Sequence, residues 1–199
     1  MKDLDIVIPL YNSSKTISQL IVRLNQWIQI NSFSTRIIFV DDASSDDTLF
    51  MISSEKIDFD FKLIKLAQNY GQHTATAVGL GVATAKLVAT IDDDLQHDPF
   101  EINKLMDTLV AQNVDLVYGN YLKKKHSISR NLGTYLLQKF LFLFGLNFNN
   151  VTSFRLMKSN VAKPFKTNVS KIIFIDDYLK KIASKEASCT VTHFDRHAG

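Results

Sequence analysis

Three consecutive aspartates, Asp92 to Asp94, follow a short apolar run that ends at Ile91. Adjacent carboxylates at the end of a buried strand repel one another and resist desolvation, so such a cluster needs a compensating positive charge. A divalent cation shared with an anionic ligand such as a diphosphate would supply that charge. The cluster therefore indicates a nucleotide substrate. The alternative is a solvated acidic turn, which is the better interpretation of an isolated Asp-x-Asp pair.

Asp94 and Gln96 are the predicted metal ligands. They lie two residues apart, so an extended chain would direct both side chains to the same side. Their oxygen atoms suit a hard Mg²⁺ or Mn²⁺ ion better than zinc. His97 is interpreted as a helix-entry residue, because a hard-metal site has little need of imidazole.

Two other polar clusters are expected beside the aspartates. Pro9-Leu10-Tyr11-Asn12 and Asp41-Asp42 each follow an apolar run, as Asp92–Asp94 do. In open parallel sheets, ligands bind outside the carboxyl ends of the strands. The three clusters are therefore predicted to meet at one edge of a sheet.

The elements that would position these clusters alternate between strand and helix over the first 120 residues. This alternation predicts an α/β fold with a mainly parallel sheet and helices on both faces. Strands are predicted at Asp5–Leu10, Arg36–Val40, Phe61–Leu66, Leu87–Ile91 and Asp115–Tyr118. Helices are predicted at about Lys15–Ile30, Asp46–Glu55, His73–Thr84 and Pro99–Gln112.

After Gly119 the alternation stops. The sequence predicts a mostly helical stretch to about Gly145, an irregular segment at Asn149–Met157, a helix near Phe174–Ser184 and a strand at Ser188–Phe194. The chain shows no internal repeat and no Pro/Gly-rich linker, so we expect one domain over residues 1–199. Its nucleotide-binding half is expected in residues 1–120 and its acceptor side in residues 121–199. The last residues form no cap or tail, which suggests a chain cut short of its natural end.

Composition limits the classes of protein to which the chain can belong. Its 199 residues are 46% hydrophobic and 22% charged, which is typical of a globular domain. The net charge of +3 is too small to indicate a nucleic-acid partner. The single cysteine, Cys189, excludes an internal disulfide framework, and no signal peptide is recognised at the N-terminus. The expected location is cytoplasmic.

No segment reaches the roughly 20 apolar residues that a membrane span requires. The richest apolar run is Phe140–Leu146. It is interpreted either as a buried helix packed on the sheet or as an interfacial helix that enters a membrane surface beside Lys123–Lys125. The second interpretation would place the protein peripherally at the inner face of a membrane.

The motifs in their order resemble those of the family 2 glycosyltransferases of the GT-A (Rossmann-like) fold. The resemblance rests on Val7–Asn12, Val40–Thr48 and Ile91–His97. Further segments are similar to the branch that acts on polyprenyl phosphates, which includes dolichol-phosphate mannose synthase and undecaprenyl-phosphate sugar transferases. These segments are Asn69–His73 leading to Ala77 and Gly79, Ser153–Met157, and Asp195-Arg196 with Gly199.

The resemblance implies a role for each matching residue. Asp41 or Asp42 would accept a hydrogen bond from the nucleotide base, and Asp92 would contact the ribose or the water shell of the metal. The other residues expected to bind the nucleotide-sugar are Pro9, Tyr11, Asn12, Gln72 and Asp93. Asp42 has a simpler alternative as a turn residue that binds its own backbone.

Arginines are the expected phosphate ligands, because a guanidinium group can donate two parallel hydrogen bonds to two phosphate oxygens. Arg130, Arg155 and Arg196 are the candidates for the donor diphosphate or the acceptor phosphate. Arg196 matches the family best and is expected to take part in catalysis with Asp94 and Asp176. The alternative for Arg155 is a structural anchor of the irregular segment.

The implied reaction is an inverting, metal-dependent transfer of a sugar from a UDP- or GDP-sugar to a polyprenyl (undecaprenyl or dolichyl) phosphate. A glycan hydroxyl acceptor and a non-catalytic nucleotide-sugar binding module are the alternatives. Asp176 is interpreted as a base or orienting group, or else, with Asp177, as part of a helix N-terminal turn.

The chain departs from the family pattern at two places. Ser13 and Ser14 stand where glutamate is common, and Ala43 replaces the usual glycine. Members of the branch also commonly continue past the final glycine into membrane helices, and we expect this chain to lack such a C-terminal membrane segment.

Overall fold

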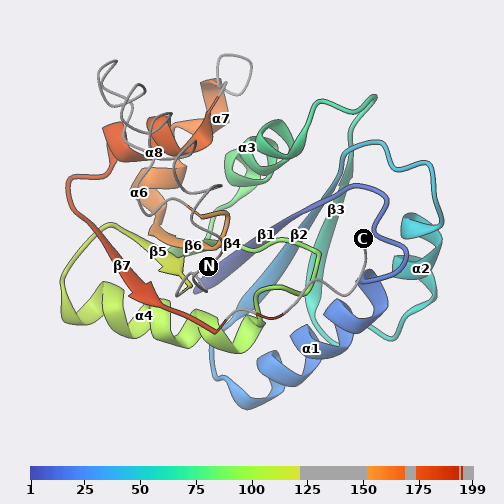
Figure 1. Ribbon diagram of the computed structural model, residues 1–199, viewed down its shortest axis with the longest axis horizontal. Coiled ribbons are helices and arrows are strands. Elements are labelled where there is room, and N and C mark those ends of the chain that lie inside the picture. The colour runs from blue at the N-terminus through green and yellow to red at the C-terminus, as the bar shows by residue number, and fades with distance from the viewer. Residues whose placement is uncertain (122–151, 169–173, 193, 195–199) are drawn as a thin grey trace, which may run out of the picture.

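The protein forms one seven-stranded sheet in the order β3-β2-β1-β4-β6-β5-β7, shown in a computed structural model that describes residues 1–121, 152–168, 174–192 and 194 (Figure 1). Strands β1, β2, β3 and β4 pair in parallel, as do β5 and β7, whereas β6 runs antiparallel to both β4 and β5. The strands are β1 (Leu4–Leu10), β2 (Thr35–Asp41), β3 (Asp60–Lys65), β4 (Leu87–Thr90), β5 (Leu116–Asn120), β6 (Arg155–Lys158) and β7 (Glu186–Thr190).

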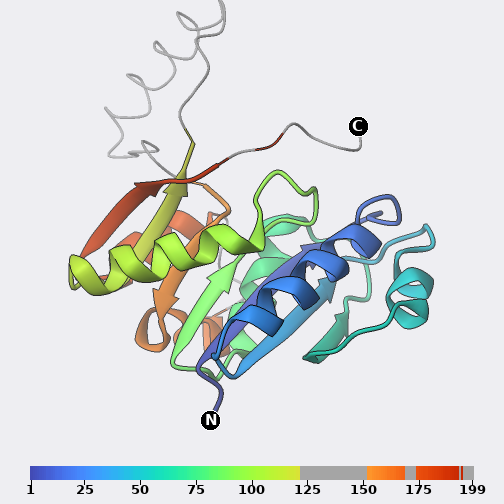
Figure 2. The ribbon, with the colours of Figure 1, turned by 90° about the horizontal axis from the view of Figure 1, so that it is seen from below.

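Helices cover both faces of this sheet and enclose two apolar cores (Figure 2). The helices are α1 (Ile17–Ile30), α2 (Thr48–Ser54), α3 (Gln72–Val82), η1 (Pro99–Glu101), α4 (Ile102–Ala111), α6 (Ser159–Ala162), α7 (Phe165–Asn168) and α8 (Ile175–Ile182). Buried residues of α1, α2 and α4, among them Trp27, pack on one face. Buried residues of α3, α6, α7 and α8 pack on the other. The predicted α/β fold with a mainly parallel sheet and helices on both faces is confirmed.

Helix α3 lies very close to β1, and a glycine permits this approach. A Cβ atom at Gly79 would lie 2.2 Å from Cγ1 of Val7, a distance that no real contact allows. Val7 itself is fully buried in the central strand. The close packing therefore fixes the distance between α3 and β1.

Two predicted elements differ from the structure. Asn149–Met157 was expected to be irregular, but Arg155–Lys158 forms β6 between β4 and β5. A four-residue strand is too short to show a clear alternation, and its partners lie far away in the sequence. The last strand is Glu186–Thr190 rather than the predicted Ser188–Phe194.

The predicted helical stretch after Gly119 lies mostly outside the described residues, as do Phe140–Leu146 and Lys123–Lys125. Over the part of the chain that the structure describes, no helix combines the length and the apolar character needed to cross a bilayer.

A buried ion pair fastens the amino-terminal end of the sheet. The Asp5 carboxylate is fully buried and accepts hydrogen bonds from Arg36 Nε at 3.0 Å and Nη2 at 2.8 Å. It also accepts the backbone N–H groups of Thr84 at 2.7 Å and Ala85 at 3.0 Å. These bonds join β1, β2 and the turn that leads into β4, so Asp5 sets the relative positions of the three strands whose far ends carry the polar clusters.

Asp5→Ala should destabilise the fold by about 3–5 kcal/mol, because it leaves a partly buried guanidinium and two backbone N–H groups without their acceptor. Urea unfolding followed by circular dichroism measures the change. The matched control is Asp58→Ala, which removes an exposed pair with Lys56 and should cost less than about 1 kcal/mol. Equal midpoints for the two variants would contradict the structural role of Asp5.

Candidate active site

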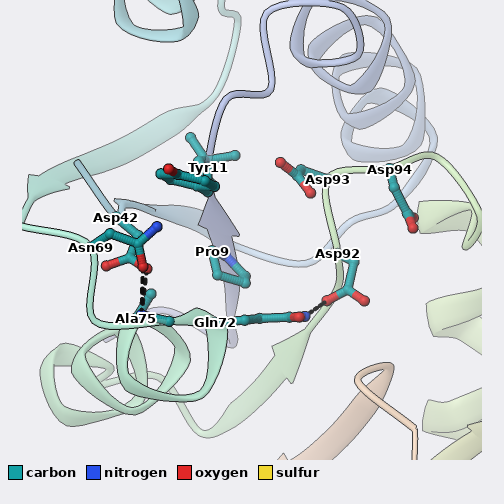
Figure 3. Close-up of a pocket in the computed structure, with 11 residues that line it drawn as sticks. Pro9, Tyr11, Asp42, Asn69, Gln72, Ala75, Asp92, Asp93 and Asp94 are labelled. Atoms are coloured by element: carbon teal, nitrogen blue, oxygen red, sulfur yellow. Dashed lines mark hydrogen bonds between the residues drawn. The ribbon is translucent and has the colours of Figure 1, made fainter. Parts of the chain in front are cut away.

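The carboxyl ends of β1, β2 and β4 surround a cavity of about 270 Å³ (Figure 3). The predicted polar clusters do meet at this edge of the sheet. The side chains relevant to chemistry on its wall are Pro9, Tyr11, Asp42, Asn69, Gln72 and Asp92–Asp94. The cavity thus has one carboxylate beside β2 and three at the end of β4.

Asp42 lies in the wall of the cavity, and Asp41 does not. The Asp42 carboxylate accepts the backbone N–H groups of Tyr70 at 2.8 Å and Gly71 at 2.7 Å. Gly71 has φ 88°, a left-handed conformation that glycine adopts without strain, immediately before α3 begins. Asp41 is fully buried, and its Oδ1 accepts the backbone N–H of Ser44. Of the two aspartates predicted as base ligands, Asp42 is therefore the one that a ligand in this cavity can reach.

The loop after β1 is tied to the loop after β2. The backbone N–H of Asn12 donates to Ser44 Oγ at 3.0 Å, and Asn12 Oδ1 accepts the backbone N–H of Ser45 at 2.9 Å. The Ser13 backbone N–H donates to Thr48 Oγ1 at 2.7 Å. Asn12 was predicted to line the nucleotide pocket, but it does not lie in the wall of the cavity. It instead holds the two loops together.

A carboxylate also anchors these loops. Burial alone would raise the pKa of Asp46, but hydrogen bonds from Ser14 and Thr48 outweigh it and lower the pKa to about 2. Ala43 lies in the same loop with φ 59°. A left-handed conformation is costly for any residue with a Cβ, which explains why glycine is usual at this position in the family that the motif resembles.

The three aspartates at the end of β4 have different partners. Asp92 Oδ1 accepts Gln72 Nε2 at 2.6 Å, and its Oδ2 accepts Ser153 Oγ. Asp93 accepts a hydrogen bond from Ser13 Oγ. Burial raises the pKa of Asp93 to about 6 and also raises that of Asp92, and charge repulsion within the cluster adds to both shifts. Burial and mutual repulsion thus make these carboxylates harder to ionise than an exposed aspartate.

The expected extended geometry at Asp94 and Gln96 is wrong. Leu95 between them has φ 62°, so the chain turns there, and the Gln96 backbone N–H donates to Asp94 Oδ1 at 3.1 Å. Asp94 lines the cavity, whereas Gln96 does not. The extended conformation does not reach these residues, because β4 ends at Thr90.

The chemistry of the donor set fits a hard divalent cation. Asp92 and Asp94 present carboxylate oxygens at the cavity, and these are ligands that Mg²⁺ and Mn²⁺ prefer. Within the described ranges, no three His, Cys, Asp or Glu side chains converge at metal-binding spacing. A cation here would therefore take its remaining ligands from bound substrate and water, as Mg²⁺ commonly does.

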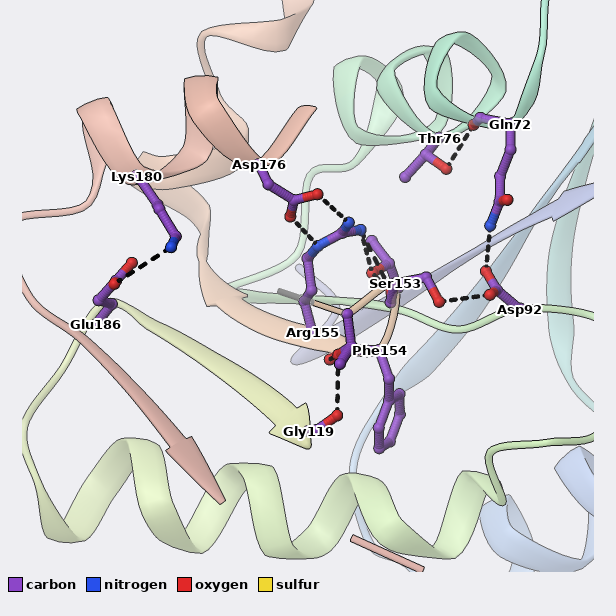
Figure 4. A network of polar contacts seen from close by, with 12 residues as sticks. Gln72, Thr76, Asp92, Gly119, Ser153, Phe154, Arg155, Asp176, Lys180 and Glu186 are labelled. Carbon is purple, nitrogen blue, oxygen red and sulfur yellow. Dashed lines mark hydrogen bonds and ion pairs between the residues drawn. The ribbon is translucent and has the colours of Figure 1, made fainter. Parts of the chain in front are cut away.

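A second cavity of about 360 Å³ shares Gln72 and Asp92 with the first. Figure 4 shows the polar contacts that link Gln72, Asp92, Ser153, Arg155 and Asp176 in its wall. Its wall includes Arg155 and Asp176, which form a buried two-pronged ion pair. Arg155 Nε and Nη2 donate to the two carboxylate oxygens of Asp176 at 2.7 and 2.8 Å. Arg155 Nη1 donates to Thr90 Oγ1 and to the Ser153 carbonyl, both at 3.3 Å. Arg155 and Asp176, predicted separately as a phosphate ligand and a base, are thus partners of each other.

The remaining predicted arginines, Arg130 and Arg196, lie outside the described residues. Sequence reasoning did not include several residues that the structure places in the two walls. These are Asn69, His73, Thr76, Thr152, Ser153 and Phe174. Small hydroxyl side chains and a lone aromatic residue do not form a motif that indicates a site. Asn69, His73 and Ser153 could have been found, because they belong to the segments that carry the family resemblance.

Curated proteins that are similar to this chain in sequence include the following two. Dodecaprenyl-phosphate galacturonate synthase of Rhizobium johnstonii is 25% identical over 209 residues, which cover 99% of this chain and 60% of that protein. Undecaprenyl-phosphate 4-deoxy-4-formamido-L-arabinose transferase of Yersinia pestis is 31% identical over 139 residues, 69% of this chain and 42% of that protein. The chain thus spans about half the length of these curated relatives.

Solved structures share the fold at low sequence identity. S. aureus TarS (residues 1–349) superposes with a TM-score of 0.64 at 15% identity, covering 97% of this chain and 59% of that one. Glucosyl-3-phosphoglycerate synthase from Mycobacterium tuberculosis, solved with Mn²⁺, UDP and glucosyl-3-phosphoglycerate, gives 0.63 at 16%, with coverage of 98% and 73%. The family model described as Glycosyl transferase family 2 matches residues 5–164, which contain both cavities apart from Phe174 and Asp176. The chain therefore belongs to glycosyl transferase family 2.

Proposed function

We propose that this protein transfers a sugar from a nucleoside diphosphate donor to a polyprenyl phosphate, with inversion at the anomeric carbon. The observation that carries the proposal is the first cavity, with Asp42 at one end and Asp92–Asp94 at the other. A nucleotide placed along it has its base near Asp42 and its diphosphate near the aspartate cluster. The names of the two curated relatives support polyprenyl phosphate as the acceptor.

Asp42 would select the base. A carboxylate oxygen can accept more than one hydrogen bond, so Asp42 can accept a ring N–H while the backbone of Tyr70 and Gly71 holds it in place. Tyr11, half exposed beside it, offers an aromatic face to the base. This arrangement suits a base with a ring N–H, such as uracil, guanine or thymine, better than cytosine or adenine. UDP- and GDP-sugars are accordingly the donors we propose.

Asp92 and Asp94 would hold a Mg²⁺ or Mn²⁺ ion, which neutralises charge on the leaving diphosphate when it is bound. Gln72 and Ser153 fix the orientation of Asp92 from two sides. Asp92 is therefore held in one geometry, without the cost of ordering it during the reaction.

The pairing of Asp176 with Arg155 bears on the acceptor. A hydroxyl acceptor needs a positioned base, but a phosphate monoester with a second pKa of about 6 is largely ionised at neutral pH and attacks without one. Both oxygens of Asp176 already accept hydrogen bonds from Arg155. This supports an orienting role for Asp176 and a phosphate acceptor.

Attack by a phosphate oxygen from the face opposite the diphosphate forms the new bond as the bond to the diphosphate breaks. We place this reaction at the cytoplasmic face of a membrane, where a polyprenyl phosphate is available.

The direct test is transfer of labelled sugar from UDP-, GDP- and dTDP-sugars to undecaprenyl phosphate, with Mn²⁺ or Mg²⁺ and a chelator control. We expect label in an acid-labile product that partitions into organic solvent and disappears with the chelator. Metal-dependent donor binding with transfer only to a glycan hydroxyl would contradict the phosphate acceptor. Binding with no turnover would indicate a nucleotide-sugar binding module.

Asp94→Ala should abolish the metal dependence of donor binding. Removal of one carboxylate ligand leaves the cation with too few protein oxygens, so titration calorimetry should give the same weak affinity with Mn²⁺ and with chelator. Asp107→Ala, which removes an exposed acid from α4, is the matched control and should keep the Mn²⁺ effect. A Mn²⁺ effect that survives in Asp94→Ala would rule out this ligand.

Asp42→Asn should weaken binding of UDP or GDP by about 10- to 100-fold, because a charge-assisted hydrogen bond to the base is lost. The asparagine also places an N–H group against the backbone donors of Tyr70 and Gly71. Asp47→Asn, on the exposed part of the same loop, should bind as the unaltered protein does. Equilibrium dialysis measures both affinities, and a thermal melt confirms that each variant is folded. Unchanged affinity in Asp42→Asn would show that the base lies elsewhere.

A further inference from the structure

Hydroxyl and carboxylate oxygens that can accept hydrogen bonds make up much of the polar surface of the second cavity. The hydroxyl groups of Thr76, Thr152 and Ser153 already donate their protons, to the Gln72 carbonyl, to the carbonyls of Gly119 and Phe154, and to Asp92 respectively. Each hydroxyl oxygen keeps lone pairs that can accept. Asp92 and Asp176, as carboxylates, are acceptors as well. A ligand that fits these groups must donate hydrogen bonds.

The cation in this wall is already engaged. Arg155 directs Nε and Nη2 at Asp176 and Nη1 at Thr90 and Ser153, and its side chain is 4% exposed. A phosphate group carries acceptors only and needs donors or free positive charge. Sugar hydroxyl groups can donate. The described wall of the second cavity therefore suits the hydroxyl groups of a sugar better than it suits a phosphate.

An aromatic pair forms another part of the wall. The Phe174 side chain, 51% exposed, precedes α8 and lies edge-to-face with the His73 ring of α3, with 6.0 Å between ring centroids. A large apolar ring left exposed at a polar cavity offers a surface on which the C–H face of a pyranose can pack. Elements from both sides of the cavity thus combine hydroxyl acceptors with an apolar face, which matches the two kinds of surface on a sugar ring.

We propose that Phe174, supported by His73, is a specificity-determining residue for the sugar of the donor, which it would contact in the second cavity. The inference rests on the proposed function, because the nucleotide must lie in the first cavity with its diphosphate at Asp92. Asp92 and Gln72 belong to both walls, so a sugar linked to that diphosphate enters the second cavity directly. Arg155 acts as a positioning residue that keeps Asp176 and the Ser153 loop in place.

The test compares the affinity for a nucleotide with that for the same nucleotide carrying a sugar. Titration calorimetry with Mn²⁺ gives the dissociation constants of UDP and a panel of UDP-sugars, or of GDP and GDP-sugars if the protein selects guanine. In Phe174→Ala the affinity for the best sugar nucleotide should fall by about tenfold, the loss of one aromatic contact, while the affinity for the free nucleotide stays the same. Phe174→Tyr should retain most of the affinity. Phe50→Ala, which removes an exposed ring from α2, is the control and should change neither constant.

Two results would overturn the inference. One is equal weakening of the nucleotide and the sugar nucleotide in Phe174→Ala, in a variant whose thermal melt is unchanged. The other is a Phe174→Ala variant that binds the sugar nucleotide as tightly as the unaltered protein does. Failure of the proposed function gives a different result, because the unaltered protein would then bind no nucleotide in the presence of Mn²⁺.

Discussion

Asp92 holds together the two cavities on which the chemistry depends. Its carboxylate lies at the end of β4 and accepts one hydrogen bond from Gln72 at the start of α3 and another from Ser153 just before β6. Burial and the nearby charge of Asp94 raise its pKa, so the group is costly to keep ionised without a cation. The two hydrogen bonds offset part of this cost and fix the carboxylate in one orientation. Asp92 thereby links the parallel strand β4 to the residues just before the antiparallel strand β6.

The two sides of Asp92 differ in what they can bind. On the side of the first cavity, Asp42 and Tyr11 form an end suited to a flat base, and the aspartate cluster forms an end suited to a cation with a diphosphate. On the other side, the Arg155–Asp176 pair engages the guanidinium group, so this cation is not available to a phosphate. The Arg155–Asp176 pair links the first turn of α8 to β6.

Close packing of α3 on β1 gives these contacts their precision. Gly79 allows the helix to approach Val7, and Gly71 allows the chain to turn into the helix while donating to Asp42. Gln72, His73 and Thr76 then follow within two turns and face the cavities. At the opposite end of the sheet, the Asp5–Arg36 pair holds β1 and β2 in register. The site therefore depends on backbone positions at both ends of the same central strands.

The sequence alone determined the α/β class, the meeting of three polar clusters at one edge and a nucleotide with a divalent cation as the ligands to expect. These follow from local patterns, because apolar runs and helix periods lie within short windows. It did not reveal β6, whose four residues gain a strand conformation only from β4 and β5 on either side. It also did not separate Asp42 from Asp41, show the turn at Leu95 or pair Arg155 with Asp176. Each of these depends on contacts between residues distant in the chain or on a single backbone angle, and only the tertiary structure decides them.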